Sequence, residues 1–279
     1  MPTTTFAGLT FERPRIMGIV NVTPDSFSDG GETVTEDAAV ARGLAMLADG
    51  ADILDVGGES TRPGAAAVSQ DEELNRVLPV VERLVGEGAV VSIDTRHGAV
   101  IAAAVAAGAA IINDVTALEG DPESLAIAAE SGAHVILMHM RGEPATMQNA
   151  PSYRDVVAQV RDYLAARVEA CEAAGIGKGR IAVDPGIGFG KTVEHNLALI
   201  ANLNRFGDLG CPLVLGASRK SFIGALSGGA GPKDRLAGSL AAALAGAERG
   251  ASILRVHDVA ETRQALAVWG AVLDANVKK

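Results

Sequence analysis

The sequence predicts an α/β protein with the fold of a (β/α)8 TIM barrel. Eight short apolar runs rich in Val, Ile and Leu occur along the chain, and a segment with helical signals follows each run. The length of 279 residues is close to the typical size of such a barrel, about 250 residues. Hydrophobic residues make up 48% of the chain and aromatic residues only 3%, a composition typical of parallel strands covered by helices. We therefore expect a single domain spanning residues 1–279.

The strands are predicted from the apolar runs. Their β-branched content and their length favour strands over buried helices. Residues 1–15 form an N-terminal extension before the first strand, and we expect them to cover or border the bottom of the barrel. An open doubly wound sheet is the alternative, but uninterrupted βα units with polar strand ends favour closure. The strands are expected at 16–22, 53–58, 90–94, 111–115, 134–139, 181–184, 213–217 and 253–257.

Helical signals occupy the segments between these strands. Ser69 to Glu72 has the pattern of a capping box at the start of a helix. Asp121 and Pro122 suggest an N-cap followed by a proline in the first turn of another helix. From residue 153 to residue 171, apolar side chains recur at helical spacing.

Each apolar run ends in a polar or ionisable residue, which a buried strand would avoid unless its end opened onto a site. In a TIM barrel the carboxyl ends of all strands meet at one rim, where the active site lies. Three long strand-to-helix loops, at 23–35, 60–69 and 140–152, are expected over the same rim. The terminal polar residues are Asn21, Glu59, Asp94, Asn113, His139, Asp184, Ser218 and His257.

Composition and charge exclude several classes of function. The 24 Lys and Arg against 34 Asp and Glu give a net charge of −10, which disfavours nucleic acid and anionic membranes as partners. The chain has no apolar stretch long enough to span a membrane, and its first residues lack the pattern of a signal peptide. Cys171 and Cys211 show no CxxC spacing and are expected to be free thiols. We therefore expect a soluble cytoplasmic protein.

Three of the strand-end residues, Asp94, Asn113 and Asp184, suggest a binding site. They could hold a metal or a flat hydrogen-bonding heterocycle, or they could simply cap helices and loops. A metal site would favour nearby His or Cys partners, and the sequence has no HxxxH or CxxC pattern. A carboxylate can instead accept both N–H groups of a 2-amino-4-oxo-pyrimidine edge.

A second group of residues at the strand ends is basic. Arg255 and His257 alternate within one strand, so their side chains should point the same way. Cations on the rim of an acidic protein suggest an anionic substrate such as a phosphate, although ordinary solvation can also explain single members. The group comprises Arg62, Arg219, Lys220, Arg255 and His257.

The segment GIGFGKT at 186–192 resembles the end of a phosphate-binding P-loop. The first glycine of that motif would have to stand at position 185, which is Pro185, so we reject a P-loop. The glycines still permit a close approach of the backbone to a flat ligand. Asn21, before the loop that begins at residue 23, could supply a neutral oxygen ligand to Mg²⁺ held by substrate phosphates, or it could simply form a turn.

Taken together, these motifs resemble one family, dihydropteroate synthase, the folate-pathway enzyme targeted by sulfonamides. They follow the order of that family and cover the chain nearly end to end. Thr116 and Arg141 depart from the polar residues expected there. The similar segments are GIVNVTPDSFSDGG (18–31), DVGGESTRPGA (55–65), SIDT (92–95), IND (112–114), DPGIGFGKTVEHN (184–196), GASRKSFIG (216–224) and RVHDV (255–259).

The resemblance implies a reaction and a set of site residues. The family condenses 6-hydroxymethyl-7,8-dihydropterin pyrophosphate with p-aminobenzoate to 7,8-dihydropteroate and releases pyrophosphate. The implied pterin-binding residues are Asp94, Asn113, Val115, Met138, Asp184, Phe189, Gly216 and Lys220. The implied pyrophosphate-binding residues are Asn21, Arg62, Arg255 and His257, with Asn21 also contacting Mg²⁺ as the metal cofactor. The implied p-aminobenzoate-binding residues are Phe27, Thr61, Arg62, Pro63 and Ser221. Catalytic roles are implied for Asn21, Arg255, His257 and Lys220.

The resemblance also implies a homodimer that takes small-molecule substrates. The Ala-rich stretch 236–247 could be a close-packed dimer face, or it could pack on strands seven and eight of the barrel. Two other functions stay open, a corrinoid-linked methyltetrahydrofolate methyltransferase and a non-catalytic pterin-binding paralogue. Release of pyrophosphate would distinguish the expected reaction from methyl transfer.

Overall fold

The strands form one parallel ring, as predicted for a TIM barrel. The structure is a computed structural model, and it describes residues 5–23, 35–60, 68–143 and 146–277. The strand order is β8-β7-β6-β5-β4-β3-β10-β9, and all neighbouring pairs are parallel. The strands are β3 (Arg15–Asn21), β4 (Ile53–Gly57), β5 (Val91–Asp94), β6 (Ile111–Asp114), β7 (His134–Met138), β8 (Ile181–Asp184), β9 (Val214–Leu215) and β10 (Ile253–Val256).

The ring closes between β8 and β9, the two strands at the ends of this order. A single bridge pairs Val183 with Leu213, and the Val183 N–H donates to the Pro212 carbonyl at 2.9 Å. β9 is only two residues long, shorter than the 213–217 expected from the sequence. The closure therefore depends on a short stretch of pairing.

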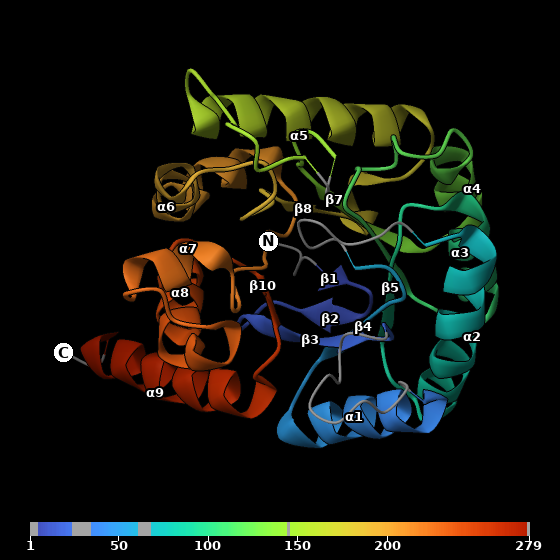
Figure 1. Ribbon diagram of the computed structural model, residues 1–279, viewed down its shortest axis with the longest axis horizontal. Coiled ribbons are helices and arrows are strands. Elements are labelled where there is room, and N and C mark those ends of the chain that lie inside the picture. The colour runs from blue at the N-terminus through green and yellow to red at the C-terminus, as the bar shows by residue number, and fades with distance from the viewer. Residues whose placement is uncertain (1–4, 24–34, 61–67, 144–145, 278–279) are drawn as a thin grey trace.

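The helices surround the ring, as Figure 1 shows. Each strand is followed by helical structure that returns the chain to the opposite end of the barrel, which is the βα repeat expected from the sequence. The helices are α1 (Glu36–Asp49), α2 (Gln70–Gly86), α3 (Gly98–Ala106), α4 (Ser124–Ser131), α5 (Val156–Ala173), α6 (Val193–Ala201), α7 (Ser221–Leu226), α8 (Leu236–Glu248) and α9 (Val259–Val277), with 3₁₀ turns η2 (Lys178–Arg180), η3 (Leu203–Leu209) and η4 (Pro232–Asp234).

Two of the predicted helix starts have different outcomes. Ser69 is the N-cap of α2, and its hydroxyl accepts from the Glu72 N–H, which confirms a helix start there. Asp121 does not cap α4, because that helix begins at Ser124. Its carboxylate instead accepts from the Gly98 N–H at 2.8 Å, at the start of the neighbouring α3. A sequence pattern cannot distinguish these two uses of the same acceptor.

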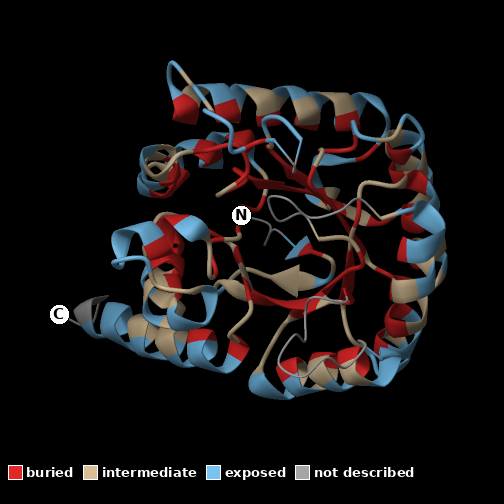
Figure 2. Cartoon of the chain, viewed as in Figure 1, coloured by how far each residue is buried: buried red, intermediate tan, exposed pale blue. Residues whose placement is uncertain are grey.

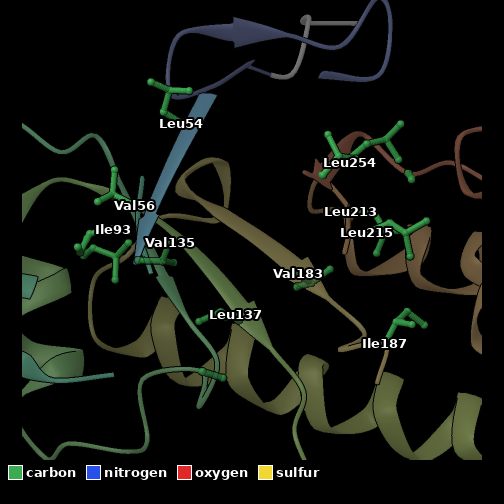
Figure 3. Close-up of a cluster of buried hydrophobic side chains, with 14 of the residues drawn as sticks. Leu54, Val56, Ile93, Val135, Leu137, Val183, Ile187, Leu213, Leu215 and Leu254 are labelled. Atoms are coloured by element: carbon green, nitrogen blue, oxygen red, sulfur yellow. The ribbon is translucent and has the colours of Figure 1, made fainter. Parts of the chain in front are cut away.

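The main hydrophobic core lies between the strands and the helices. Alternate side chains of each strand point outward and pack under the helices. Figure 3 shows part of this layer, with residues from strands around the ring. Figure 2 shows the same arrangement across the molecule, with buried residues on the strands and on the inner faces of the helices. The labelled residues in Figure 3 include Leu54, Val56, Ile93, Val135, Leu137 and Leu215.

A second, smaller core fills the inside of the barrel where the strands begin. It contains inward-facing residues of several strands together with Phe6, which is fully buried. Phe6 belongs to the N-terminal hairpin of β1 (Thr5–Phe6) and β2 (Leu9–Thr10). Its ring stands edge-on to that of His134, with the ring centroids 4.9 Å apart. The hairpin therefore closes the bottom of the barrel and leaves the opposite end for the site. The strand residues of this core are Met17, Ile53, Ile111, Ile136, Ala182, Val214 and Ile253.

Candidate active site

The inward-facing positions at the carboxyl ends of the strands are polar, in contrast to the apolar layer at the bottom. Because successive residues of a strand alternate between faces, the positions two and four residues beyond the bottom layer also face inward. The register places Asp94 beside both Gly57 and Asn113, and Asp184 beside Met138. Polar side chains from non-consecutive segments are thus brought to one end of the barrel.

One pocket at this end contains all the residues that the family resemblance assigns to the pterin. Gly186, Ile187 and Arg255 line the same pocket. Asn113, Val115, Met138, Asp184 and Phe189 are each less than a tenth exposed, so the pocket walls are held by packing. The assigned residues on its walls are Asp94, Asn113, Val115, Met138, Asp184, Phe189, Gly216 and Lys220.

Arg255 lies at the centre of an ion-pair cluster beneath the pocket. Its Nε donates to Asp55 Oδ2 and its Nη2 donates to Asp94 Oδ2, both at 2.6 Å. The amide of Asn113 donates to both carboxylate oxygens of Asp55, at 3.3 and 3.2 Å. Asp55 is fully buried and links two site residues. Its role was not predictable from the sequence, because Asp55 lies inside an apolar run rather than at its end.

The charges of this cluster shift the proton affinities of its members. Burial raises the pKa of Asp94 from 3.8 to about 7, and Asp55 adds to this rise, while Arg255 opposes it. Burial alone would lower the pKa of Arg255, but the two carboxylates more than reverse this effect and its pKa is raised. Arg255 therefore keeps its charge, whereas Asp94 exchanges its proton near neutral pH.

Asp184 and Lys220 provide the second charged pair of the pocket. Burial raises the pKa of the Asp184 carboxyl, while the Gly186 N–H and the charges of Lys220 and Arg255 act in the opposite direction. The Gly186 N–H donates to Asp184 Oδ1 at 2.7 Å. Lys220 Nζ lies 4.0 Å from the centroid of the Phe189 ring, a cation–π contact across the pocket. An acceptor, a cation and an aromatic face thus meet within one pocket.

His257 and Asn21 lie at the same end of the barrel. The Ser218 hydroxyl accepts the His257 backbone N–H at 3.2 Å and lies 3.0 Å from its Nδ1. The hydroxyl can donate its own proton to Nδ1, and in that tautomer the His257 Nε2 carries the ring proton. Asn21 ends β3, beside Gly57 of β4. Among the described residues no three His, Cys, Asp or Glu side chains form a metal cluster. A single amide ligand fits Mg²⁺ that is bound mainly by a substrate diphosphate.

Comparison with known proteins identifies the family. A family profile described as "Pterin binding enzyme" matches residues 17–257. The chain is 50% identical over 272 residues to the dihydropteroate synthase of Escherichia coli K12, covering 97% of this chain and 96% of that protein. The chain belongs to the dihydropteroate synthase family of pterin-binding enzymes.

Solved structures of this family have the same fold. One is the dihydropteroate synthase of Xanthomonas albilineans with 4-aminobenzoic acid, at a TM-score of 0.90 and 55% identity over 96% of each chain. Another is the enzyme of the same organism in complex with 7,8-dihydropteroate, at a TM-score of 0.87 and 52% identity over 95% of each chain. Both the sequence of motifs and the barrel are therefore shared with dihydropteroate synthases.

Some residues that the family resemblance assigns lie apart from the pocket or outside the described residues. Ser221 is exposed at the start of α7, directly after Lys220. Arg219, expected among the basic residues, forms an ion pair with Asp258 at the start of α9. The remaining assigned residues, Phe27, Thr61, Arg62 and Pro63, lie outside the part of the chain that the structure describes.

The two departures from the dihydropteroate synthase pattern occur beside the pocket rather than in it. The Thr116 hydroxyl donates to Asp114 at 2.6 Å and stabilises the turn after β6. Arg141 donates to the Ser152 carbonyl and stacks over the Tyr153 ring, 4.8 Å from its centroid. Both residues stabilise local loop structure, so they leave the pocket-lining set unchanged.

Lys191 is a buried residue of the site region whose position the sequence did not predict. It ends the glycine-rich segment that resembled a P-loop, and it is 3% exposed. A P-loop lysine would face a phosphate, whereas Lys191 Nζ donates to the Phe189 carbonyl at 3.0 Å. The lysine therefore points back into the protein.

Proposed function

We propose that this barrel condenses 6-hydroxymethyl-7,8-dihydropterin pyrophosphate with p-aminobenzoate, the reaction of dihydropteroate synthase. The observation that carries the proposal is the single pocket that gathers all the residues assigned to the pterin, with Arg255 beneath it. The relatives from Xanthomonas albilineans with 4-aminobenzoic acid and with 7,8-dihydropteroate support the same substrate and product.

The pocket is suited to the polar edge of a pterin. We assign the Asp184 carboxylate to accept the exocyclic amino group and a ring N–H, a bidentate arrangement. Asn113 and Asp94 hold the remaining polar edge, and Lys220 donates to the ring carbonyl. The flat ring lies among Val115, Met138, Phe189 and Gly216, which are apolar.

The leaving pyrophosphate is assigned to the cationic side of the mouth. Arg255 and His257 donate hydrogen bonds to the oxygens on which negative charge grows, and such electrostatic contacts are worth about 3–4 kcal/mol each when well placed. Two N–H groups of Arg255 are used by Asp55 and Asp94, and its remaining N–H groups are assigned to the diphosphate. Mg²⁺, with Asn21 as its protein ligand, would neutralise further charge on the diphosphate when bound.

The proposed reaction needs no strong base in the protein. The C–O bond between the pterin methylene and the diphosphate breaks, the arylamine nitrogen forms a new C–N bond, and one amine proton is released. An arylamine is already unprotonated at neutral pH, so no Ser-His-Asp arrangement is required. We infer a path in which C–O cleavage leads, with the methylene cation delocalised into the dihydropterin ring.

A cationic Lys220 beside a cationic intermediate is an apparent conflict in this path. The structure offers an electrostatic answer, because Asp184 and Asp94 line the same pocket. Lys220 also lies over the face of Phe189, whose ring partly balances its charge. We assign Lys220 to orienting the ring through its carbonyl.

A direct assay tests the function. The chain is incubated with the pterin pyrophosphate, labelled p-aminobenzoate and Mg²⁺, and labelled pteroate and released pyrophosphate are measured. Formation of both in equal amounts is expected. Pterin binding without pyrophosphate release would instead indicate a non-catalytic pterin-binding protein.

We also propose that the chain acts as a homodimer through α9. Val268 and Val272, one helical turn apart on this helix, are 62% and 58% exposed and form an apolar surface on it. The Ala-rich stretch of α8 is a poorer candidate, because a Cβ on Gly246 would lie 2.1 Å from Leu215 Cδ2 of the barrel. Sedimentation equilibrium of the wild type and of a Val268→Asp, Val272→Asp variant tests this: a dimer and a monomer are expected, respectively.

The cellular compartment is part of the same proposal. The described helices include none that is both long and apolar enough to cross a membrane. Cys171 and Cys211 are free, and burial raises the pKa of each thiol to about 11. We infer a reducing, cytoplasmic location, which fractionation of cells producing the tagged chain would test.

A further inference from the structure

The loop between β8 and α6 is pressed against the chain that follows β7. Gly186, Gly188 and Gly190 all have positive φ, at 69°, 82° and 65°. A Cβ on Gly186 would lie 1.9 Å from the His139 carbonyl oxygen, and one on Gly190 would lie 2.3 Å from that of Arg141. This segment, Gly186–Gly190, presents Phe189 to the pocket, and we call it the glycine loop.

The ammonium of Lys191 lies between the glycine loop and the chain after β7. Its Nζ is 3.0 Å from the Phe189 carbonyl oxygen, 3.0 Å from His139 Nδ1 and 3.3 Å from the His139 carbonyl oxygen. An ammonium has three donors and no acceptor, so three acceptors satisfy it fully. One acceptor belongs to the glycine loop and two belong to the segment after β7, so this single charge connects the two segments.

His139 is held in a form that can accept from Lys191. Burial and the nearby Lys191 charge lower the pKa of His139 to about 3, so its ring stays neutral. The edge-on ring of Tyr163, on α5, lies 5.0 Å away between centroids and fixes the ring plane. Figure 1 shows α5 running alongside β7 and β8. His139 therefore keeps a lone pair available at Nδ1.

We propose that Lys191 is a positioning residue for pterin binding, whose buried ammonium fixes the glycine loop and so holds Phe189 as a wall of the pocket. The proposal rests on the pterin site proposed above. Lys191 does not itself line the pocket, and it acts through its hydrogen bond to the backbone carbonyl of Phe189, which does.

The charge of Lys191 also acts on the pterin-binding carboxylate. Burial raises the pKa of Asp184, and the charge of Lys191 is among the contributions that oppose this rise and favour the ionised, accepting carboxylate. Burial lowers the pKa of Lys191 itself from 10.5 to about 7, Asp184 opposes this, and Lys220 adds to it. The ring of His139, which contacts Lys191, stays neutral. Near neutral pH a rise in pH therefore removes the charge that orders the glycine loop.

A matched pair of substitutions tests the proposal in the full chain. Lys191→Met removes the buried charge, and Lys178→Met makes the same change at an exposed position of η2, where the strand of Asp184 begins. The affinity for 6-hydroxymethyl-7,8-dihydropterin is measured by calorimetry at pH 6 and pH 9. At pH 6 we expect about tenfold weaker binding for Lys191→Met and wild-type binding for Lys178→Met, since a hydrogen bond to a charged group is lost only in the first.

The pH dependence separates positioning from a purely structural effect. The ratio of dihydropterin affinities between wild type and Lys191→Met should fall to about twofold at pH 9, because the wild-type lysine has then lost its proton. Titration of the ligand or of Asp94 changes the affinity of wild type and of Lys191→Met alike, so it cancels in the ratio of the two affinities. The proposal would be overturned if wild type and Lys191→Met bound dihydropterin equally at pH 6, or if the ratio of their affinities were the same at pH 6 and pH 9.

A measurement without ligand distinguishes failure of this inference from failure of the proposed function. Hydrogen exchange of the amides in the glycine loop should be faster in Lys191→Met than in Lys178→Met, and unchanged exchange would overturn the inference. Absence of dihydropterin binding by the wild type would count against the pterin site itself. If Lys191→Met does not fold, Lys191→Gln, which keeps N–H donors without the charge, is compared in the same way.

Discussion

Asp184, the residue assigned to the polar edge of the pterin, is a buried carboxylate among several cations. It is 6% exposed, accepts the Gly186 N–H with one oxygen, and is surrounded by the charges of Lys220, Arg255 and Lys191. A carboxylate in this setting is poorly solvated and gains from two N–H donors of a ligand.

Replacing Asp184 by Asn should therefore weaken pterin binding while the shape of the pocket is kept. The amide presents a donor to a ligand donor, and we expect a loss of roughly 2 kcal/mol or more. Calorimetry with 6-hydroxymethyl-7,8-dihydropterin measures it. Asp162→Asn, at an exposed surface position on α5, is the control and should bind as wild type. Unchanged binding by Asp184→Asn would remove Asp184 from the site.

Asp94 should make pterin binding depend on pH. Burial raises the pKa of Asp94 from 3.8 to about 7 in the folded protein. The carboxyl therefore keeps its proton between pH 3.8 and pH 7 and loses it only near neutral pH. For folding alone the raised pKa means that its contribution to stability is complete below about pH 3.8 and declines as the pH rises to 7. An ionised Asp94 accepts from the ligand, so the ratio of wild-type to Asp94→Asn affinity should rise between pH 6 and 8. A flat ratio would show that Asp94 does not accept from the pterin.

Arg255, which is assigned to the pyrophosphate, is also the ion-pair partner of two carboxylates in the structure. From the sequence, Arg255→Ala should depress turnover and leave binding of a bare pterin nearly intact. In the structure the same change leaves Asp55 and Asp94 without their partner, and removing one partner of a buried pair costs about 3–5 kcal/mol. We now expect a loss of unfolding free energy in urea together with weaker binding. Arg161→Ala, which breaks only exposed ion pairs, should show neither.

At the residue scale, the positions of side chains on the strands were predictable from the sequence, because successive residues of a strand alternate between its two faces. Asn21, Asp94, Asn113 and Asp184 each end an apolar run, and parity alone places them inside the barrel. The role of Asp55 was not predicted, because an acidic residue within an apolar run does not indicate which buried partner it contacts. The burial of Lys191 was not predicted, because a charged lysine is expected to be exposed. Its three hydrogen-bond acceptors come together only in the folded structure.

At the scale of elements, the glycine loop is the segment most constrained by its backbone. Gly186→Ala would require a left-handed conformation and would push a Cβ into the His139 carbonyl. Strain and overpacking together should lower the unfolding free energy by about 3 kcal/mol or more and abolish dihydropterin binding. Gly177→Ala is the matched control, because Gly177 has a φ of −60° and open space at its Cβ. Denaturant titrations of both variants measure the difference, and similar stabilities would contradict the strain argument.

The existence and order of the elements were predictable from periodicity, whereas some of their ends were not. β3 to β8 and β10 lie within one or two residues of the predicted ranges, because β-branched runs bounded by polar residues are strong strand signals. β9 has only two residues, since its pairing depends on neighbours at the point of closure rather than on its own composition. Asp121 likewise caps a helix distant in sequence, which no local pattern encodes.

At the scale of the whole molecule, the inside of the barrel has an apolar end and a charged end. The bottom of its interior is apolar and is closed by the N-terminal hairpin, while the charged groups lie at the opposite end. The sequence predicted this polarity, since it placed residues 1–15 before the first strand and the polar residues at the strand ends.

Phe6→Ala should therefore reduce stability without changing the pocket. Phe6 is fully buried against the inward side chains of the strands, and removing such a ring costs about 3–5 kcal/mol. Thermal or urea unfolding should show the loss. At a temperature where the variant is folded, its dihydropterin affinity should equal that of the wild type, and a weakened affinity would mean that the two ends of the barrel are coupled.

The short closure between β8 and β9 has a consequence for ligand binding. Asp184 ends one of these strands, while Gly216 and Lys220 follow the other, and the two strands share only the bridge between Val183 and Leu213. In the proposed binding mode, a pterin held by Asp184 and Lys220 spans this joint and adds its own hydrogen bonds to it. Binding of the pterin would then stabilise the closed ring of strands, because a ligand that binds only the folded state stabilises that state.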